Sequence, residues 1–335
     1  MAIATGRILL AENAEKPMKD KRHIVVTGGA GFIGSTIAIR LIAEGHKVTI
    51  LDNLSTGKEE NIPLQADFLK VDIGNEQDGQ RYYNIDCDVV FHIAGQSSGE
   101  ASFDNPLYDL KSHVMSTFYI LQWCKKKNIK RFMYSSSMSV YGDPEYLPVD
   151  EIHPLRPKSF YGAAKISAEA YINLFHTLGI NTTVFRLFSV YGPQQNLENK
   201  KQGIVSIYLS YMLEKIPILV KGSKNRVRDL IYIDDVLNLW MTALDNPISY
   251  GQTYNVATGK GTMVEELLET MKMIFEITDY PINYTSGTPG DVFGIVGNNT
   301  KAKKHFNWQP TIDIGEGLKK MTSIEKIKTR DNKRS

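Results

Sequence analysis

The feature that most constrains the fold is a glycine-rich segment between a β-branched run and a run of helix formers. Gly28, Gly31 and Gly34 follow the run Ile24–Thr27 at intervals of three residues. The first glycine allows a sharp turn, the second lets backbone N–H groups approach a diphosphate, and the third lets the helix pack closely on the strand. The segment therefore predicts a strand, a tight turn and a helix that together bind a dinucleotide.

An acidic residue about twenty positions later indicates which dinucleotide is bound. The apolar run Val48–Leu51 ends in Asp52, whose carboxylate can accept both hydroxyls of an adenosine ribose. The same carboxylate would repel a 2′-phosphate, and no arginine follows within the next few positions to attract one. The sequence therefore predicts NAD as the cofactor rather than NADP.

Short apolar runs alternate along the chain with amphipathic helical patterns. The predicted strands are Ile24–Thr27, Val48–Asp52, Phe68–Val71, Val89–Ile93, Arg131–Ser135 and Thr182–Phe188, and the predicted helices are Phe32–Glu44, Asn105–Lys126 and Tyr161–Leu178. This order predicts an α/β fold with a doubly wound parallel sheet of the Rossmann type. Because such sheets bind ligands at the carboxyl ends of their strands, the site should collect residues after Thr27, Asp52, Ile93 and Ser135.

The pattern of apolar and polar residues changes after Gly192–Pro193, and the polar stretches that predict loops become longer. We predict an N-terminal extension at residues 1–20 and an NAD-binding Rossmann domain at 21–188, with a return near 231–257. Tyr254–Ala257 is predicted to rejoin the main sheet. Residues 189–335 are predicted to form mainly a smaller α/β substrate-binding lobe and a basic C-terminal tail at Lys326–Arg334.

Composition excludes several classes of function. Lys and Arg number 39 against 37 Asp and Glu, a net charge of +2, and no long basic run lies within the body of the chain, so nucleic acid is not an expected partner. The seven histidines lie far apart, and Cys87 and Cys124 match no ligand spacing, so no metal site is expected. No apolar run approaches the roughly eighteen residues of a membrane span, which argues against a membrane partner. The cysteine content and the lack of a signal-peptide pattern predict a cytoplasmic protein.

A tyrosine and a lysine four residues apart carry the predicted chemistry. Tyr161 and Lys165 open a predicted helix and share one of its faces. A phenol is a poor base at neutral pH, but a nearby ammonium stabilises the phenolate and lowers the phenol pKa. Ser137, at the end of a predicted strand, can bind the same substrate hydroxyl and stabilise developing charge. A second pair with this spacing, Tyr211 and Lys215, has no upstream hydroxyl cluster and is interpreted as part of an ordinary helix in the second lobe.

Seven segments occur in the order typical of one protein family: Thr27–Gly34, Asp52–Gly57, Phe91–Ala94, Ser135–Gly142, Tyr161–Lys165, Val190–Pro193 and Arg228–Asp235. Together they resemble the extended short-chain dehydrogenase/reductases, in the nucleotide-sugar epimerase branch typified by UDP-glucose 4-epimerase. The resemblance implies a tightly held NAD, a UDP-hexose between the lobes, and often a homodimer. The dimer would form through a four-helix bundle of Asn105–Lys126 and Tyr161–Leu178.

The resemblance also implies the residues of the site. Those expected to bind the cofactor are Gly28, Gly31, Phe32, Ile33, Gly34, Asp52, Asn53, Asp72, Ile73, Ala94, Gly95, Tyr161 and Lys165. Those expected to contact the substrate are Gln96, Ser137, Tyr161, Ser189 and Arg228, with the Arg228 guanidinium on the diphosphate.

Three positions depart from the family pattern. Ser189 and His113 stand where many relatives have asparagine, and Thr288 replaces an arginine that relatives use as a second diphosphate contact. Another basic residue, Lys221 or Lys224, is a candidate to replace the missing charge.

The residues that follow Ser137 indicate the type of reaction. Related dehydratases carry an Asp-Glu pair and related decarboxylases a glutamate where this chain has Met138 and Ser139. Without a carboxylate there, the simplest chemistry is oxidation and re-reduction at one carbon, predicted as inversion at C4 of UDP-glucose, UDP-galactose or the N-acetylated pair. Ile295, at the position that governs acceptance of N-acetyl groups, does not decide between them. The alternatives are a UDP-glucuronate 4-epimerase, another nucleotide-sugar epimerase or dehydratase and, least expected, a non-catalytic NAD-bound sensor.

Overall fold

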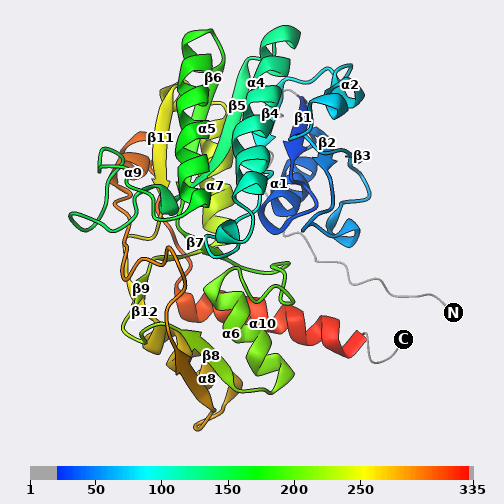
Figure 1. Cartoon of the computed structure of the whole chain (residues 1–335). Coiled ribbons are helices and arrows are strands. Elements are labelled where there is room, and N and C mark those ends of the chain that lie inside the picture. The colour runs from blue at the N-terminus through cyan, green and yellow to red at the C-terminus, as the bar shows by residue number, and fades with distance from the viewer. Residues whose placement is uncertain (1–20, 332–335) are drawn as a thin grey trace, which may run out of the picture.

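The protein is described by a computed structural model that covers residues 21–331, so the predicted extension at 1–20 lies outside the described residues. Its centre is a parallel sheet of seven strands in the order β11-β6-β5-β4-β1-β2-β3 (Figure 1). The strands are β1 (His23–Thr27), β2 (Lys47–Asp52), β3 (Asp67–Lys70), β4 (Val89–His92), β5 (Arg131–Ser137), β6 (Asn181–Leu187) and β11 (Gln252–Val256). From β1 the chain adds β2 and β3 toward one edge of the sheet, and then adds β4, β5 and β6 on the other side of β1. The direction in which strands are added therefore reverses between β1 and β4. The predicted doubly wound sheet is confirmed, and so is the predicted return of Tyr254 to it.

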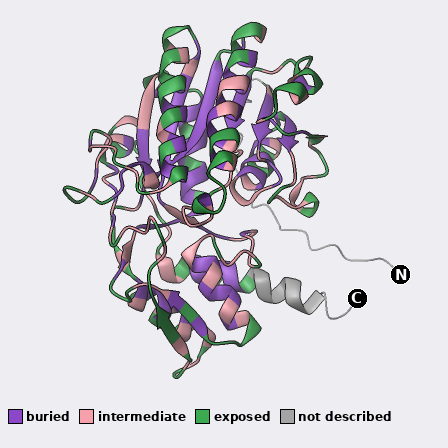
Figure 2. Ribbon diagram, in the orientation of Figure 1, coloured by how far each residue is buried: buried purple, intermediate pink, exposed green. Residues whose placement is uncertain are grey.

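Alternation along the strands explains how the sheet is covered on both faces. Val25 and Val90 belong to the apolar core on one face, and Val26 and Phe91 belong to the core on the other. These side chains are at most 1 % exposed, as expected for parallel strands that read as nearly continuous apolar runs. Figure 2 shows the sheet buried between helices whose outer faces are exposed.

The helices of the large domain contribute their apolar stripes to these two cores. Ile120 of α4 and Ile172 of α5 pack on one face of the sheet, and Ile37 of α1 and Trp240 of α7 pack on the other. The bounds are α1 (Phe32–Ala43), α2 (Gly79–Tyr82), α4 (Ser116–Lys127), α5 (Phe160–Thr177), α7 (Ile233–Leu244) and α9 (Thr300–Phe306). Short 3-10 helices lie between these elements: η1 (Glu59–Asn61), η2 (Glu76–Asp78), η3 (Ala101–Phe103), η5 (Met138–Val140) and η6 (Pro247–Ser249).

The helix predicted at Asn105–Lys126 is not uniform. It begins with a short α-helix, α3 (Pro106–Asp109), continues as a π-helix, η4 (Leu110–Met115), and returns to an α-helix at α4. The π-helix, with hydrogen bonds from i to i+5, is rare and frequently occurs at functional sites. The periodicity of the sequence gave no sign of it.

A smaller lobe completes the chain below the sheet in Figure 1. Its elements and their links to the large domain are β7 (Ser189–Tyr191), α6 (Ile204–Glu214), β8 (Ile218–Lys221), β9 (Val227–Arg228), β10 (Leu230–Tyr232), β12 (Thr262–Met263), α8 (Val264–Phe275), β13 (Ile282–Thr285) and α10 (Ile314–Asp331). Leu209, Leu267 and Leu318 continue the core of the α1 face into this lobe. The basic segment predicted as a tail from Lys326 continues the backbone of α10 as far as Asp331.

Candidate active site

A crevice of about 720 Å³ lies at the carboxyl ends of the strands and extends to the smaller lobe. Its walls come from the glycine turn after β1, from the ends of β2, β4 and β5, and from loops of the smaller lobe. The predicted site residues line this crevice: Gly28, Gly31, Phe32, Ile33, Gly34, Asp52, Asn53, Asp72, Ile73, Ala94, Gly95, Gln96, Ser137, Tyr161, Lys165, Ser189 and Arg228. Their individual contacts with ligands stay predictions, but the structure brings them to one place.

The glycine turn is tight enough to exclude larger residues. Gly28 has φ +70° and its N–H donates to the Leu51 carbonyl at 2.8 Å. A Cβ on Gly34 would overlap the Gly28 carbonyl oxygen, so the third glycine is required by close packing of helix on strand. Gly31 precedes α1, and no side chain caps this helix end. Backbone N–H groups at an uncapped helix N-terminus are suited to a diphosphate.

Asp52 supports the turn as well as lining the crevice. Its two carboxylate oxygens accept the N–H of Ala30 at 2.9 Å and the N–H of Leu54 at 2.8 Å. A carboxylate oxygen can accept a further hydrogen bond, so both remain able to receive a ribose hydroxyl. The carboxylate therefore connects the end of β2 with the glycine turn.

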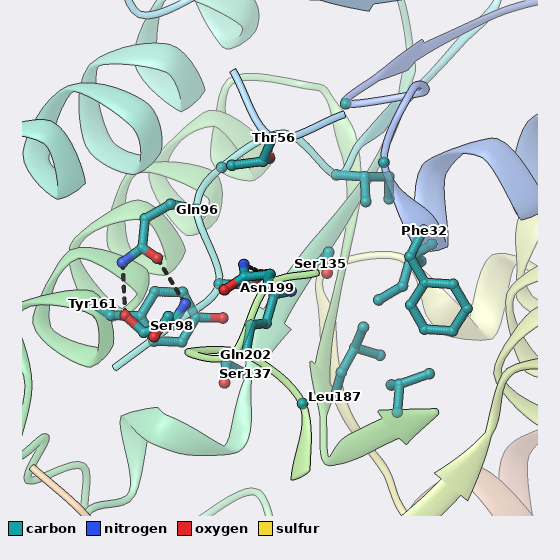
Figure 3. Close-up of a pocket in the computed structure, with 18 of the residues that line it drawn as sticks. Phe32, Thr56, Gln96, Ser98, Ser135, Ser137, Tyr161, Leu187, Asn199 and Gln202 are labelled. Atoms are coloured by element: carbon teal, nitrogen blue, oxygen red, sulfur yellow. Dashed lines mark hydrogen bonds between the residues drawn. The ribbon is translucent and has the colours of Figure 1, made fainter. Parts of the chain in front are cut away.

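The phenol of Tyr161 and the hydroxyl of Ser137 lie together at the other end of the crevice, as Figure 3 shows. Ser137 ends β5, and its Oγ donates to the Ser139 hydroxyl at 3.1 Å. Burial raises the pKa of Tyr161 to about 12, while the hydroxyl of Ser137 acts in the opposite direction. Removal of the phenolate from water therefore dominates in this arrangement, and the lowering of this pKa by Lys165 stays a prediction.

Lys165 is directed at the backbone beneath the phenol. Its Nζ donates to the Ser135 carbonyl at 2.6 Å and lies 5.8 Å from the ring centroid of Tyr161. Burial lowers the pKa of Lys165 to about 7, and the carboxylates of Glu169 and Asp109 act to raise it. The protonation of this lysine is therefore set by a balance between burial and two acidic neighbours.

Arg228 faces the crevice from the smaller lobe in an ion pair. Its guanidinium lies 2.6 Å from Asp291, whose other oxygen pairs with Arg226 at 2.5 Å. Thr288 also lines the crevice, and its carbonyl accepts the N–H of Asp291 at 3.2 Å. Lys221 and Lys224 do not line it: they pair with Glu100 and Glu265, each at 2.7 Å. The expectation that either lysine replaces the missing arginine is therefore not supported.

Two further findings concern the described part of the chain. Within residues 21–331 no cluster of three or more His, Cys, Asp or Glu side chains is arranged to hold a metal ion. None of the helices in that range has the length and apolar character needed to cross a membrane.

Comparison with known proteins gives the family. Residues 24–257 match the model of the NAD dependent epimerase/dehydratase family. A putative UDP-glucose 4-epimerase of Methanocaldococcus jannaschii is 37 % identical over 92 % of this chain and 99 % of its own length. The chain belongs to this family. The UDP-glucose 4-epimerase of Thermotoga maritima, solved with UDP-glucose, superposes with a TM-score of 0.87 at 33 % identity, covering 92 % of this chain and 99 % of that one. The UDP-N-acetylglucosamine 4-epimerase of Methanobrevibacter ruminantium, solved with UDP-N-acetylmuramic acid, gives a TM-score of 0.85 at 29 % identity, covering 92 % and 100 %.

The crevice of this epimerase/dehydratase fits the NAD on which the family depends. The uncapped start of α1 provides donors for the diphosphate, and Asp52 provides acceptors for the adenosine ribose. Tyr161 and Lys165 line the same crevice, so the cofactor and a phenol that could act as a base would share one site. The fit rests on donors, acceptors and shape that the described residues already provide.

Some lining residues of this family member were not found from its sequence. The loop after β7 brings Asn199 and Gln202 into the crevice (Figure 3), and the Ser98 hydroxyl donates to the Lys201 carbonyl at 2.6 Å. Asn199 and Gln202 were not predicted from sequence, because polar loops carry no periodic signal. The amide nitrogen of Gln96 donates to Asp109 at 2.7 Å and to the Ser98 carbonyl, so its side chain supports the wall as well as lining it.

Proposed function

We propose that this protein epimerises a UDP-hexose at C4, through oxidation to a 4-keto sugar and re-reduction on the opposite face. The observation that carries the proposal is the composition of the reactive end of the crevice. Tyr161, Ser137 and Lys165 meet there, while the neighbouring lining positions are Met138 and Ser139. Between 135 and 161 no described lining residue is a carboxylate. Removal of water from the sugar would need such an acid and base, and oxidation at one carbon does not.

The residues have separable roles in this reaction. Tyr161 accepts the proton of the C4 hydroxyl, and Ser137 holds that hydroxyl and the developing ketone oxygen. When bound, NAD supplies the acceptor and donor of hydride and adds a positive charge to the crevice. We expect the Tyr161 phenolate to form only in the loaded site, where that charge adds to the ammonium of Lys165. The same lysine would hold the nicotinamide ribose.

We propose a neutral hexose as substrate rather than a hexuronate. Cations that line the crevice already pair with acids: Lys58 with Glu198, Lys158 with Asp143, Lys201 with Asp104 and Arg228 with Asp291, at 2.6 to 3.0 Å. Lys165 is directed at a backbone carbonyl. A sugar carboxylate would therefore have to displace an existing partner, and it would meet Glu100 in the wall. The UDP diphosphate, with more charge, can share Arg228 with Asp291.

We also propose that the enzyme is a homodimer in the cytoplasm. Leu174 of α5 and Leu178, which directly follows α5, are 61 % and 52 % exposed. Leu107 and Leu110, at the start of the preceding helical run, are 58 % and 48 % exposed. α4 and α5 pack side by side, with Phe118 edge-on to Tyr171 at 5.5 Å. Two such helix pairs would cover these side chains in a four-helix bundle. Two free cysteines fit a reducing compartment.

Product analysis tests the proposed reaction. UDP-glucose, UDP-N-acetylglucosamine and UDP-glucuronate are incubated separately with the purified protein, without added cofactor, and the products are identified by proton NMR. We expect at least one neutral sugar to reach equilibrium with its 4-epimer, and acid-denatured protein to release NAD. A 4-keto-6-deoxy product would contradict the reaction type. Conversion of UDP-glucuronate alone would contradict the substrate class.

A further inference from the structure

A buried histidine lies directly behind the reactive phenol. The ring of His113 meets the ring of Tyr161 edge-on, with centroids 5.3 Å apart and planes at 66°. His113 is 1 % exposed and belongs to the π-helix η4, whereas Tyr161 belongs to α5. The contact therefore joins two elements that form separate walls of the same crevice.

The histidine ring is held mainly by packing. Neither ring nitrogen makes a hydrogen bond of good geometry within the described structure, although the backbone of Gln96 is close enough to interact with the ring. The carboxylate oxygen of Asp109 is 3.8 Å from Nε2. On another side the ring lies against Gly95, where a Cβ would overlap Cε1 of His113. Gly95 lines the crevice, so the glycine makes room for the ring close to the cofactor wall. The ring thus fills the space between Gly95, Asp109 and Tyr161.

The surroundings also keep this ring uncharged. Burial holds the pKa of His113 well below its usual range, and the ammonium of Lys165 and the buried ring of His92 act in the same direction. The backbone of Gln96 acts in the opposite direction, and Asp109, whose own pKa is raised by burial, is the acidic group that faces the ring. A neutral ring next to Tyr161 leaves Lys165 as the cation beneath the phenol.

We propose that His113 is a positioning residue that holds the Tyr161 ring in the direction needed for proton transfer. The proposal rests on the function proposed above. A phenol on an unsupported side of a helix can turn about its side-chain bonds, and a small misalignment of a proton acceptor slows the transfer strongly. The π-helix supplies the support, because its wide turn brings the imidazole between Gly95 and the phenol.

Two substitutions separate the shape of the ring from its nitrogens. His113→Ala removes the ring, and His113→Phe keeps a flat ring without nitrogens. We expect kcat of His113→Ala to fall about 10- to 100-fold with the KM for the UDP-sugar within about threefold, and His113→Phe to recover most of the loss. His153→Ala is the matched control, because His153 is also buried and packs edge-on to a tyrosine, Tyr141, at 5.6 Å.

A readout that does not depend on turnover completes the test. The protein is labelled with 3-fluorotyrosine, and the fluorine resonance of Tyr161 is assigned by its loss in Tyr161→Phe. We expect this resonance to shift and broaden in His113→Ala, to return toward its original position in His113→Phe, and to stay in place in His153→Ala. An unchanged kcat and resonance in His113→Ala, or equal impairment of the phenylalanine variant, would overturn the proposal. If the unmodified enzyme converts no UDP-hexose, the function proposed above fails while the resonance still decides the role of His113.

Discussion

A buried ion pair beneath the active site gives the sharpest quantitative prediction. Arg186 on β6 donates to both oxygens of Glu169 on α5, at 3.1 and 2.8 Å, and the Ser136 hydroxyl donates to the same carboxylate at 2.5 Å. Arg186 and Glu169 are each 5 % exposed. Removal of one partner of such a pair leaves the other charge buried without compensation, which costs about 3–5 kcal/mol.

We therefore expect Glu169→Gln to lose a large part of the stability of the fold. A loss of about 3–5 kcal/mol, from a total of about 5–15 kcal/mol, corresponds to a fall in melting temperature of about 4–7 °C for a chain of 335 residues. The double variant Glu169→Gln with Arg186→Met should recover much of this loss, because neither charge is then left alone. Glu316→Gln, which removes an exposed pair with Lys320 at 2.8 Å, should change stability by no more than about 1 kcal/mol.

The same substitution should alter the pH dependence of catalysis. Glu169 is the first of the two carboxylates that raise the pKa of Lys165, which burial lowers to about 7. Without this carboxylate the pKa of Lys165 falls further, so the ammonium is lost at lower pH and the alkaline limb of kcat moves to lower pH. Thermal melts and a kcat profile from pH 6 to 10 test both effects. A melting temperature within 1 °C of the original would refute the energetic argument, and an unmoved alkaline limb would refute the link to Lys165.

Other perturbations follow from single features of the structure. In Gly34→Ala the new methyl overlaps the Gly28 carbonyl, so we expect the fold to lose about 1–3 kcal/mol of stability and the protein to lose its co-purified NAD. If acid denaturation of this variant released a full content of NAD, the glycine-turn argument would be wrong. Burial lowers the pKa of His92 from 6.5 to about 3. The unfolded chain therefore takes up a proton at this residue below pH 6.5 that the folded protein does not, so the free energy of unfolding falls between pH 6.5 and pH 3. The slope of that fall is about 1.4 kcal/mol per pH unit. His92→Gln should flatten that part of a urea-unfolding profile, and an unaltered slope would show that the histidine titrates normally. Leu174→Glu should convert a dimer to a monomer in light scattering while Leu64→Glu, at a side chain 98 % exposed, should not; a dimeric Leu174→Glu would contradict the proposed interface.

The sheet could be predicted from sequence because its signal is local and repeated. Apolar β-branched runs such as Val48–Leu51 fit strands buried on both faces, and the glycine turn determines how the first strand meets its helix. The topology then places the strand ends together, so residues as distant in sequence as Asp52 and Tyr161 could be assigned to one crevice.

The features that could not be predicted depend on packing between distant segments. The ring of His113, which belongs to the π-helix, packs against Gly95 and Tyr161, and no periodicity in the sequence encodes these contacts. The raised pKa of Tyr161 is a property of burial, which the four-residue spacing to Lys165 does not report. The pairing of Lys221 with Glu100 likewise depends on how the two lobes meet.

The most direct test of the central claim follows the hydrogen on the inverted carbon. UDP-glucose carrying deuterium at C4 is converted by the purified enzyme in ordinary water, and the product is examined by NMR and mass spectrometry. The account predicts that the product keeps the deuterium at C4, because hydride held on the carbon of a bound nicotinamide does not exchange with water before it returns to the sugar. Exchange of the deuterium with water during epimerisation would contradict it.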